Sequence, residues 1–261
     1  MSYSILNLIS SEVLELVERI PEETRCRKHR YAFVDKVLAD MIKADEPAPI
    51  IIYGRRGAGK TTYSMKTVAQ YLMQYEGVEC GEAYYKIITE YLVYHPRDFI
   101  ERLRSHRKVI IWDDAGQWLS TYFWYDPDLR PYLVAIINWF DTSRTSLGAP
   151  IFTTPTPKKL PPKIRDDVYI ILTRVRRAGT GKNGFKIAKA HTIVFEESEY
   201  RVGRRYVVAE LSDYYEVRLP DPVYQAYKPI RDAYHQLATE LLHRAMTTGN
   251  IYTLENEDTN Y

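Results

Sequence analysis

The chain has 261 residues, of which 45% are hydrophobic, so it can bury the core of one large domain and is not disordered throughout. Its formal net charge is only +2, which excludes a general polyanion binder and leaves local basic patches as the means of any nucleic-acid contact. No apolar run approaches the roughly 18 residues that span a bilayer, and no signal-peptide pattern is seen, so we expect a cytoplasmic protein without a membrane span. The two cysteines, Cys26 and Cys80, are far apart and make no metal-binding spacing, so they are expected to be reduced thiols.

The N-terminal segment, residues 1–46, is predicted to be helical. Apolar residues recur at helical spacing through residues 1–20, and Pro21 is expected to end that helix. A second helix is predicted for residues 31–43. A proline-containing link then leads to the first stretch with recognisable chemistry.

That stretch is a glycine-rich turn between the apolar run Ile50–Tyr53 and a helical pattern. The fixed positions of the phosphate-binding motif G-x-x-x-x-G-K-[ST] are filled by Gly54, Gly59, Lys60 and Thr61. Glycines let the backbone curl around a phosphate, the lysine reaches the β- and γ-phosphates, and the hydroxyl ligates Mg²⁺. The alternative is a glycine turn that matches by chance. The residues expected to bind the nucleotide are Gly54, Arg55, Arg56, Gly57, Ala58, Gly59, Lys60, Thr61 and Thr62.

Two adjacent carboxylates follow a second apolar run. Residues 83–94, before it, fit a helix and a strand equally, whereas Val109–Trp112 is typical of a buried parallel strand. Paired acids at a buried strand end need a counter-charge, because ionised carboxylates are costly to desolvate. A magnesium–nucleotide complex supplies that charge, so Asp113 is predicted to hold the metal with Thr61, and Asp114 to orient the attacking water. The alternative is a capped turn with two surface acids.

A third strand is predicted near Phe152, after a helix from Pro131 to Arg144. In nucleotide motors of this topology, the strand after the paired acids carries a polar residue that senses the γ-phosphate. Thr153 or Thr154 would be that residue, and Thr154 is taken as the candidate.

The most basic stretch of the chain lies between residues 174 and 189. Its glycine-rich middle, Gly179–Gly184, lacks the spacing of a second phosphate loop and is interpreted as a hairpin tip. Alternating segments at 186–195 and 201–211 predict an antiparallel hairpin. A basic tip suits contact with a DNA backbone, and a merely solvated hairpin is the alternative. The candidate DNA-binding residues are Arg174, Arg176, Arg177 and Lys182.

The predicted fold class is α/β: a P-loop NTPase with a mainly parallel sheet flanked by helices, plus a C-terminal β-hairpin and a long helix from about Val223 to Met246. Four regions are expected along the chain. They are an N-terminal helical segment (1–46), a P-loop core (47–172), a basic β-hairpin region (173–219), and a C-terminal helix and tail (220–261).

These motifs together resemble a known group of enzymes. The P-loop and the pair Asp113-Asp114 resemble the ASCE division of P-loop ATPases, in which a strand lies between the P-loop strand and the Walker B strand. The segment Asp141–Pro155, followed by Ile164-Arg165, resembles the HerA/FtsK-like motors, and especially the Zot-like ATPases of filamentous phages and related ATPases of archaeal viruses and plasmids. The resemblance covers roughly residues 48–172. Those families usually have Gln after the sensor strand, where this chain has Thr154-Pro155, and many have Glu where Asp114 stands.

The resemblance implies an ATPase that uses ATP and Mg²⁺ and acts on DNA in virus or plasmid replication, packaging or segregation. It implies a homo-oligomer, of which a hexameric ring is one form, and an arginine from the neighbouring subunit that completes the site. Arg144 and Arg165 are the candidates, with Arg165 preferred.

Three alternatives stay open. An AAA+ replication initiator or helicase loader would have a helical lid, whereas residues 168–211 are predicted to be strands. A Zot-like ATPase of virion assembly or export would work without DNA contact. A small-molecule kinase would need an acceptor pocket, and the sequence identifies none.

Overall fold

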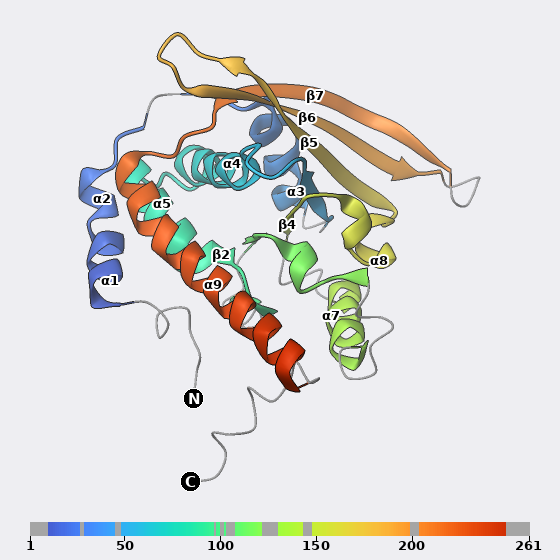
Figure 1. Ribbon diagram of the computed structural model, residues 1–261. Coiled ribbons are helices and arrows are strands. Elements are labelled where there is room, and N and C mark those ends of the chain that lie inside the picture. The colour runs from blue at the N-terminus through green and yellow to red at the C-terminus, as the bar shows by residue number, and fades with distance from the viewer. Residues whose placement is uncertain are drawn as a thin grey trace.

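The computed structural model describes residues 10–26, 29–44, 48–96, 98, 99, 102, 108–121, 130–142, 148–198 and 204–248. Figure 1 shows a twisted sheet with helices on both sides and a long helix crossing in front of it. Within the described residues, no helix is both long enough and apolar enough to cross a membrane.

One sheet organises the described chain, with seven strands in the order β2-β3-β4-β1-β5-β6-β7. The first five strands in this order run parallel, and β6 and β7 are antiparallel additions. Strand β4 lies between β1 and β3, which is the arrangement expected for the ASCE division. The strands are β1 (Ile50–Tyr53), β2 (Leu92–Val93), β3 (Val109–Trp112), β4 (Ala149–Thr154), β5 (Tyr169–Thr180), β6 (Lys186–Glu197) and β7 (Arg205–Glu216). The predicted α/β fold class, with a mainly parallel sheet flanked by helices, is confirmed.

Two hydrophobic cores cover the two faces of the parallel strands. In β1, Ile50 and Ile52 face one core, and Ile51 faces the other. The first core includes α4 (Lys60–Tyr75), which begins directly after the P-loop. The second includes α7 (Arg130–Thr142) and α8 (Pro162–Arg165). Strands buried on both faces explain the continuous apolar runs of the sequence.

The N-terminal helices are shorter than the sequence predicts. Residues 10–23 form α1 (Ser11–Glu18) and α2 (Ile20–Glu23), and the chain turns at Arg19. The prediction that Pro21 ends the helix was wrong: Pro21 lies in the first turn of α2, where a missing N–H costs no hydrogen bond.

The other predicted helices are present. The second one includes a π-helical turn, η2 (Val34–Leu38), and α3 (Ala39–Ala44). The ambiguous stretch 83–94 contains both states, with α5 (Cys80–Lys86), the π-turn η3 (Ile87–Tyr91) and then β2. The C-terminal helix α9 runs from Asp221 to Thr248. Two short 3-10 turns, η4 (Ala115–Gln117) and η7 (Pro157–Lys159), follow β3 and β4.

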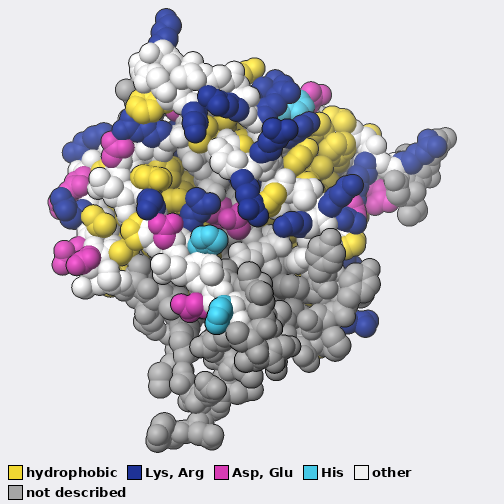
Figure 2. Space-filling view, viewed as in Figure 1, with side chains coloured by type: hydrophobic (Ala, Val, Ile, Leu, Met, Phe, Trp, Pro, Cys, Tyr) yellow, Lys and Arg dark blue, Asp and Glu magenta, His cyan; other side chains and the backbone are white. Residues whose placement is uncertain are grey.

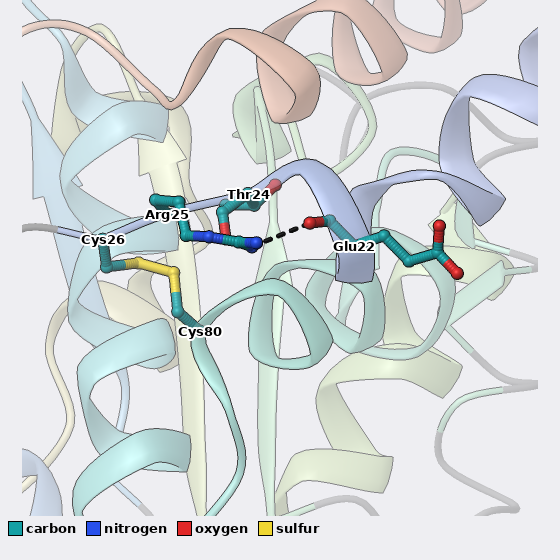
Figure 3. Close-up of a disulfide and its surroundings, with 5 residues drawn as sticks. All are labelled: Glu22, Thr24, Arg25, Cys26 and Cys80. Atoms are coloured by element: carbon teal, nitrogen blue, oxygen red, sulfur yellow. Dashed lines mark hydrogen bonds between the residues drawn. A yellow bond between two sulfur atoms is a disulfide. The ribbon is translucent and has the colours of Figure 1, made fainter.

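The two cysteines form a disulfide, so the prediction of reduced thiols was wrong. Cys26 and Cys80 are 54 residues apart in sequence, and their Cα atoms lie 5.9 Å apart (Figure 3). Packing of α2 against α5 brings them together: a Cβ on Gly81 would lie only 2.2 Å from the carbonyl oxygen of Pro21. Sequence separation alone does not report such an approach, because a disulfide depends on distance and direction in the fold.

Strand β5 runs past the expected end of the P-loop core at residue 172. It has 12 residues and continues through the basic stretch to Thr180. The expected boundary between residues 172 and 173 therefore falls inside a strand, and β6 and β7 continue the same sheet. The hairpin tip is found where it was predicted, with a turn at residues 181–184.

Candidate nucleotide-binding site

The P-loop joins β1 to α4 at the carboxyl edge of the sheet, with Gly59 as the residue before the helix. Gly59 has a φ of 98°, a conformation that favours glycine. Gly54 has a second reason to be glycine, since a Cβ there would lie 2.2 Å from the carbonyl oxygen of Val175 in β5. The loop is thus shaped by close contact with the strand beside it.

Lys60 is buried at the first position of α4, with 8% of its surface exposed. Its Nζ donates hydrogen bonds to the carbonyl oxygens of Gly54, at 3.3 Å, and Arg55, at 3.4 Å. Burial lowers the pKa of Lys60, and the carboxylates of Asp114 and Asp113 oppose that shift. The ammonium group lies over the loop, where a phosphate could replace the carbonyl contacts.

Asp113, 1% exposed at the end of β3, is the centre of the site. Its Oδ1 accepts hydrogen bonds from Thr61 Oγ1 at 2.7 Å and Thr153 Oγ1 at 2.5 Å. Its Oδ2 accepts a hydrogen bond from the hydroxyl of Tyr227 in α9, at 3.2 Å. The carboxylate therefore joins the P-loop helix, strand β4 and the C-terminal helix, and it lies beside the hydroxyl expected to ligate Mg²⁺.

Asp114 has an unusual backbone conformation. Its φ is 48°, and it is the one non-glycine residue with positive φ in the described parts of the chain. Its N–H donates to Thr153 Oγ1 at 2.9 Å, which fixes the turn. Burial and the neighbouring Asp113 raise the pKa of Asp114, against the opposing charges of Lys60, Arg231 and Arg56. Such strained, partly buried acids are found at functional sites.

The structure brings Thr153, rather than Thr154, to the paired carboxylates. Thr154 is buried on the opposite side of β4, and its hydroxyl donates to the carbonyl oxygen of Thr156 at 3.1 Å. Alternation along β4 explains the difference, because successive side chains of a strand face opposite sides of the sheet.

Of the two predicted arginines, only Arg165 lies within the described residues, and it is not part of this cluster. Arg165, in α8, contacts the carboxylate of Asp166 at 3.0 Å and the carbonyl oxygen of Lys158 at 3.5 Å. Arg144 lies outside the described residues. Arg55 and Arg56, in the P-loop, are exposed.

Three site residues were missed by sequence reasoning. Tyr227 and Arg231 come from α9, where the tyrosine fits the apolar stripe of an ordinary amphipathic helix. Tyr215, in β7, donates from its hydroxyl to the carbonyl oxygen of Gly59 at 2.9 Å. No short motif marks these residues, since the chain must fold before α9 and β7 approach the P-loop.

The candidate DNA-binding residues divide between two sides of the antiparallel strands. Arg174 and Arg176 lie on the face opposite α4, which we call the outer face of β5–β7, whereas Val175 between them is buried. Arg177 alternates to the other side, and Lys182 lies in the hairpin turn; both are exposed.

Neighbouring strands extend the outer face. Arg176 pairs in register with Lys189, and Lys189 with Tyr214. The Nζ of Lys189 lies 5.6 Å from the centroid of the Tyr214 ring. In the next row, Arg174 pairs with His191. Figure 2 shows Lys and Arg side chains gathered over this part of the molecule, beside a run of hydrophobic side chains.

No protein-family model matches the chain. A structural comparison finds the crystal structure of a KaiC-like protein, PH0186, from the hyperthermophilic archaea Pyrococcus horikoshii OT3, with a TM-score of 0.36 and 12% identity over 61% of this chain and 84% of that one. A sequence comparison finds the uncharacterized protein B-251 of Sulfolobus spindle-shape virus 1, 31% identical over 211 residues, which are 77% of this chain and 80% of the viral protein. The chain therefore belongs to the family of protein B-251 of Sulfolobus spindle-shape virus 1.

Proposed function

We propose that this chain is an ATP-hydrolysing motor or switch that acts on DNA for a virus or plasmid, in replication, packaging or segregation. The observation that carries the proposal is the joint hydrogen bonding of Thr61 and Thr153 to the buried carboxylate of Asp113. This arrangement brings the P-loop, the acid proposed to hold the metal and the hydroxyl proposed to sense the γ-phosphate together at one edge of a parallel sheet. We name the activity from this site, since fold alone does not determine function.

The residues present fit ATP and Mg²⁺. The amides of Gly54–Thr62 and the buried Lys60 would bind the phosphates, and Thr61 with Asp113 would hold the metal, in the last case through water. When bound, Mg²⁺ would neutralise the developing charge on the phosphates. Asp113 keeps its carboxylate aimed by the hydroxyls of Thr61, Thr153 and Tyr227.

Asp114 would orient the attacking water. The water oxygen forms a bond to the γ-phosphorus, and the bond from that phosphorus to the bridging oxygen breaks, so that ADP keeps the electron pair. A water proton passes toward Asp114 and on to phosphate or solvent. The raised pKa of Asp114 suits this work, because a carboxylate closer in pKa to neutral accepts a proton more readily.

The direct test is steady-state hydrolysis of ATP with Mg²⁺ by the wild type and by Lys60→Ala and Asp114→Asn. We expect Lys60→Ala to abolish turnover, and Asp114→Asn to retain ATP binding while turnover falls roughly 10²-fold or more. The matched control is Lys66→Ala, nearly two helical turns further along α4 and outside the phosphate loop. Full turnover by Lys60→Ala would refute the assignment.

Contact with DNA is supported by the contacts that β5 and β7, the strands that carry the outer face, make with the P-loop. Val175, between Arg174 and Arg176, presents its carbonyl oxygen to Gly54 of the P-loop. Tyr215, next to Tyr214, holds the carbonyl oxygen of Gly59. In β5 and in β7, a residue on the outer face that could contact nucleic acid therefore lies next to a residue on the inner face that contacts the P-loop. Basic side chains bind the phosphate backbone, and an exposed tyrosine can stack on a base.

All four proposed residues, Arg174, Arg176, Arg177 and Lys182, are expected to contribute to affinity. The test compares Arg174→Ala/Arg176→Ala with the matched pair Arg177→Ala/Lys182→Ala. The matched pair removes the same number of charges, but from positions outside the outer face. Each pair should reduce the slope of log affinity against log salt by about 2, because each basic side chain is expected to neutralise about one phosphate. Unchanged affinity at low salt in both variants would remove DNA from the proposal.

Within the P-loop ATPases, we favour the HerA/FtsK-like and Zot-like group. The described residues after β4 give a β-rich region and one long helix, which departs from the helical lid of an AAA+ initiator or loader. A homo-oligomer, with a hexameric ring as one form, follows from the same resemblance, as do an arginine supplied in trans and a place in the cytoplasm. An assembly or export ATPase without DNA contact is the outcome if the DNA test fails while hydrolysis persists.

A further inference from the structure

Helix α9 crosses the carboxyl edge of the sheet and is fixed there by two tyrosines. Tyr227 donates to Asp113 Oδ2 at 3.2 Å, and Tyr234 donates to Asp98 Oδ2 at 2.6 Å. The ring of Tyr234 also stacks on that of Tyr94, with 4.6 Å between centroids. Figure 1 shows α9 running across the front of the molecule. The helix is therefore held in one register over the site.

Arg231 lies between these two anchors. It is four residues after Tyr227 and three before Tyr234, so it shares their face of the helix. The two tyrosines are buried, with 5% and 9% of their surface exposed, whereas Arg231 is exposed. Arg231 is therefore one helical turn from the tyrosine that bonds to Asp113, on the same face of α9, and its side chain meets solvent.

The charges around Arg231 agree with this position. The carboxylates of Asp113 and Asp114 help to raise the pKa of Arg231, after the larger effect of Tyr227. In turn the guanidinium helps to lower the pKa of Lys60 and opposes the rise at Asp114. Within the described residues, Arg231 makes no direct ion pair or hydrogen bond. No residue that the structure describes therefore uses its donors.

We propose that Arg231 is an arginine supplied in cis, whose guanidinium contacts the terminal phosphate of ATP bound in its own subunit. This inference rests on the proposed function and adds one residue to its site. Arginine suits the role because its planar fork of donors matches phosphate oxygens and stays charged at every working pH. The register set by Tyr227 would make α9 the element that responds to loss of the γ-phosphate.

The variants Arg231→Ala and Arg231→Lys test the role, with Lys228→Ala as the matched control. Lys228 is on the same helix, is exposed, and pairs with Asp232 at 3.0 Å, away from the site. We expect Arg231→Ala to lower kcat roughly 10²- to 10³-fold, the effect of losing one preorganised donor. Arg231→Lys should recover part of the loss, and Lys228→Ala should behave like the wild type.

Binding separates this inference from the proposed function. Affinities for ADP and for a non-hydrolysable ATP analogue need no turnover, so they remain informative if the wild type does not hydrolyse ATP. Arg231→Ala should lower the affinity for the ATP analogue at least tenfold and leave the affinity for ADP unchanged. If it leaves both affinities and kcat equal to those of Lys228→Ala, the inference is wrong. If Arg231→Ala is poorly folded, Arg231→Gln is measured in its place.

A mixing experiment tells cis from trans. Arg231→Ala subunits have an intact P-loop, and Lys60→Ala subunits have an intact Arg231. If Arg231 acts within its own subunit, mixing the two inactive proteins restores no hydrolysis. Restored hydrolysis would show that Arg231 serves the neighbouring subunit, and the cis assignment would be overturned.

Discussion

The parallel and antiparallel halves of the sheet differ in what covers them. Strands β1, β3 and β4 are buried on both faces, and their carboxyl ends carry the P-loop, Asp113 and Thr153. Strand β6 alternates between buried and partly exposed residues, whereas β7 is largely exposed and buries only Asp213 and Tyr215. The parallel half can thus build a site at its edge, whereas the antiparallel half can offer a surface.

Strand β5 belongs to both halves. Its first residues are buried beside β1, and its later residues alternate along the antiparallel ladder. Through Val175 it touches Gly54, and through its outer residues it meets solvent. We infer that the two halves are connected at the P-loop.

The largest effect is expected in the parallel half, from Asp113→Ala. The change removes the acceptor for Thr61, Thr153 and Tyr227, and with it the proposed metal-holding group. Hydrolysis should fall roughly 10³-fold, as for the loss of a principal electrostatic group, while DNA affinity stays within about twofold. Steady-state rates and fluorescence anisotropy measure the two. If the hydrolysis rate and the DNA affinity fell together, hydrolysis and DNA binding would not belong to separate halves of the sheet.

The contact between the halves is expected to control stability through Asp213, in β7. Its carboxylate accepts hydrogen bonds from the N–H groups of Ala32 and Phe33 and from the hydroxyl of Tyr63. Asp213→Ala leaves these three donors without a partner and should cost about 4.5 kcal/mol or more, because bonds to charged acceptors are worth about 1.5–3 kcal/mol each. Chemical denaturation measures the loss.

Glu210→Ala is the control for Asp213→Ala, since Glu210 is on the same strand but exposed. We expect a change within about 0.5 kcal/mol for this surface substitution. Equal losses in the two variants would contradict the view that inward residues of β7 hold α4 to the helical segment that begins at Ala32.

The disulfide joins the segment after α2 to α5, outside the seven-stranded sheet, and should affect stability without affecting the rate of hydrolysis. Cys26→Ser opens a covalent loop set by a sequence separation of 54 residues. The free energy of unfolding should fall by about 3 kcal/mol, and reductant should have the same effect on the wild type. Disulfides are typical of oxidising compartments, and intracellular proteins of hyperthermophiles are an exception. If reduction of the disulfide lowered kcat, the view that it affects only stability would be contradicted.

The smallest effect concerns pH and the contact of α4 with β7. Lys66 donates to the carbonyl oxygen of Glu216 at 2.8 Å, and burial lowers its pKa from 10.5 to about 8. Between these values the unfolded chain binds a proton that the folded chain lacks, so stability should rise with pH above about 8. The rise should end near pH 10, where tyrosines of the unfolded chain ionise while buried ones such as Tyr31 stay protonated.

Lys66→Met should flatten that slope, as measured by urea midpoints at pH 8 and pH 9.5. Lys158→Met, at an exposed position, is the control and should leave the slope in place. An unchanged slope in Lys66→Met would show that Lys66 is not the group responsible.

The parallel half was largely predictable from sequence. A P-loop motif and a buried run that ends in Asp113-Asp114 report local structure, and local structure was enough to place them on one edge. Thr154 was the predicted sensor, but successive side chains of β4 face opposite sides of the sheet, and it is Thr153 that bonds to Asp113. The predicted roles of these residues remain proposals.

The antiparallel half and the closing contacts were not predictable in the same way. The length of β5 was hidden because its basic residues interrupt the apolar pattern, and only pairing with β6 makes that segment a strand. The disulfide, Tyr215 and the α9 residues depend on contacts between distant segments, and a single sequence carries no signal for them.

The most direct test of the account is the rate of ATP hydrolysis with and without DNA, for the wild type and for Arg174→Ala/Arg176→Ala. We predict that DNA stimulates the wild type and that the double variant keeps its basal rate but loses the stimulation, even at saturating DNA. The pair Arg177→Ala/Lys182→Ala should keep the stimulation once DNA is saturating. Stimulation that survives in Arg174→Ala/Arg176→Ala would contradict the proposed connection between the outer face and the P-loop.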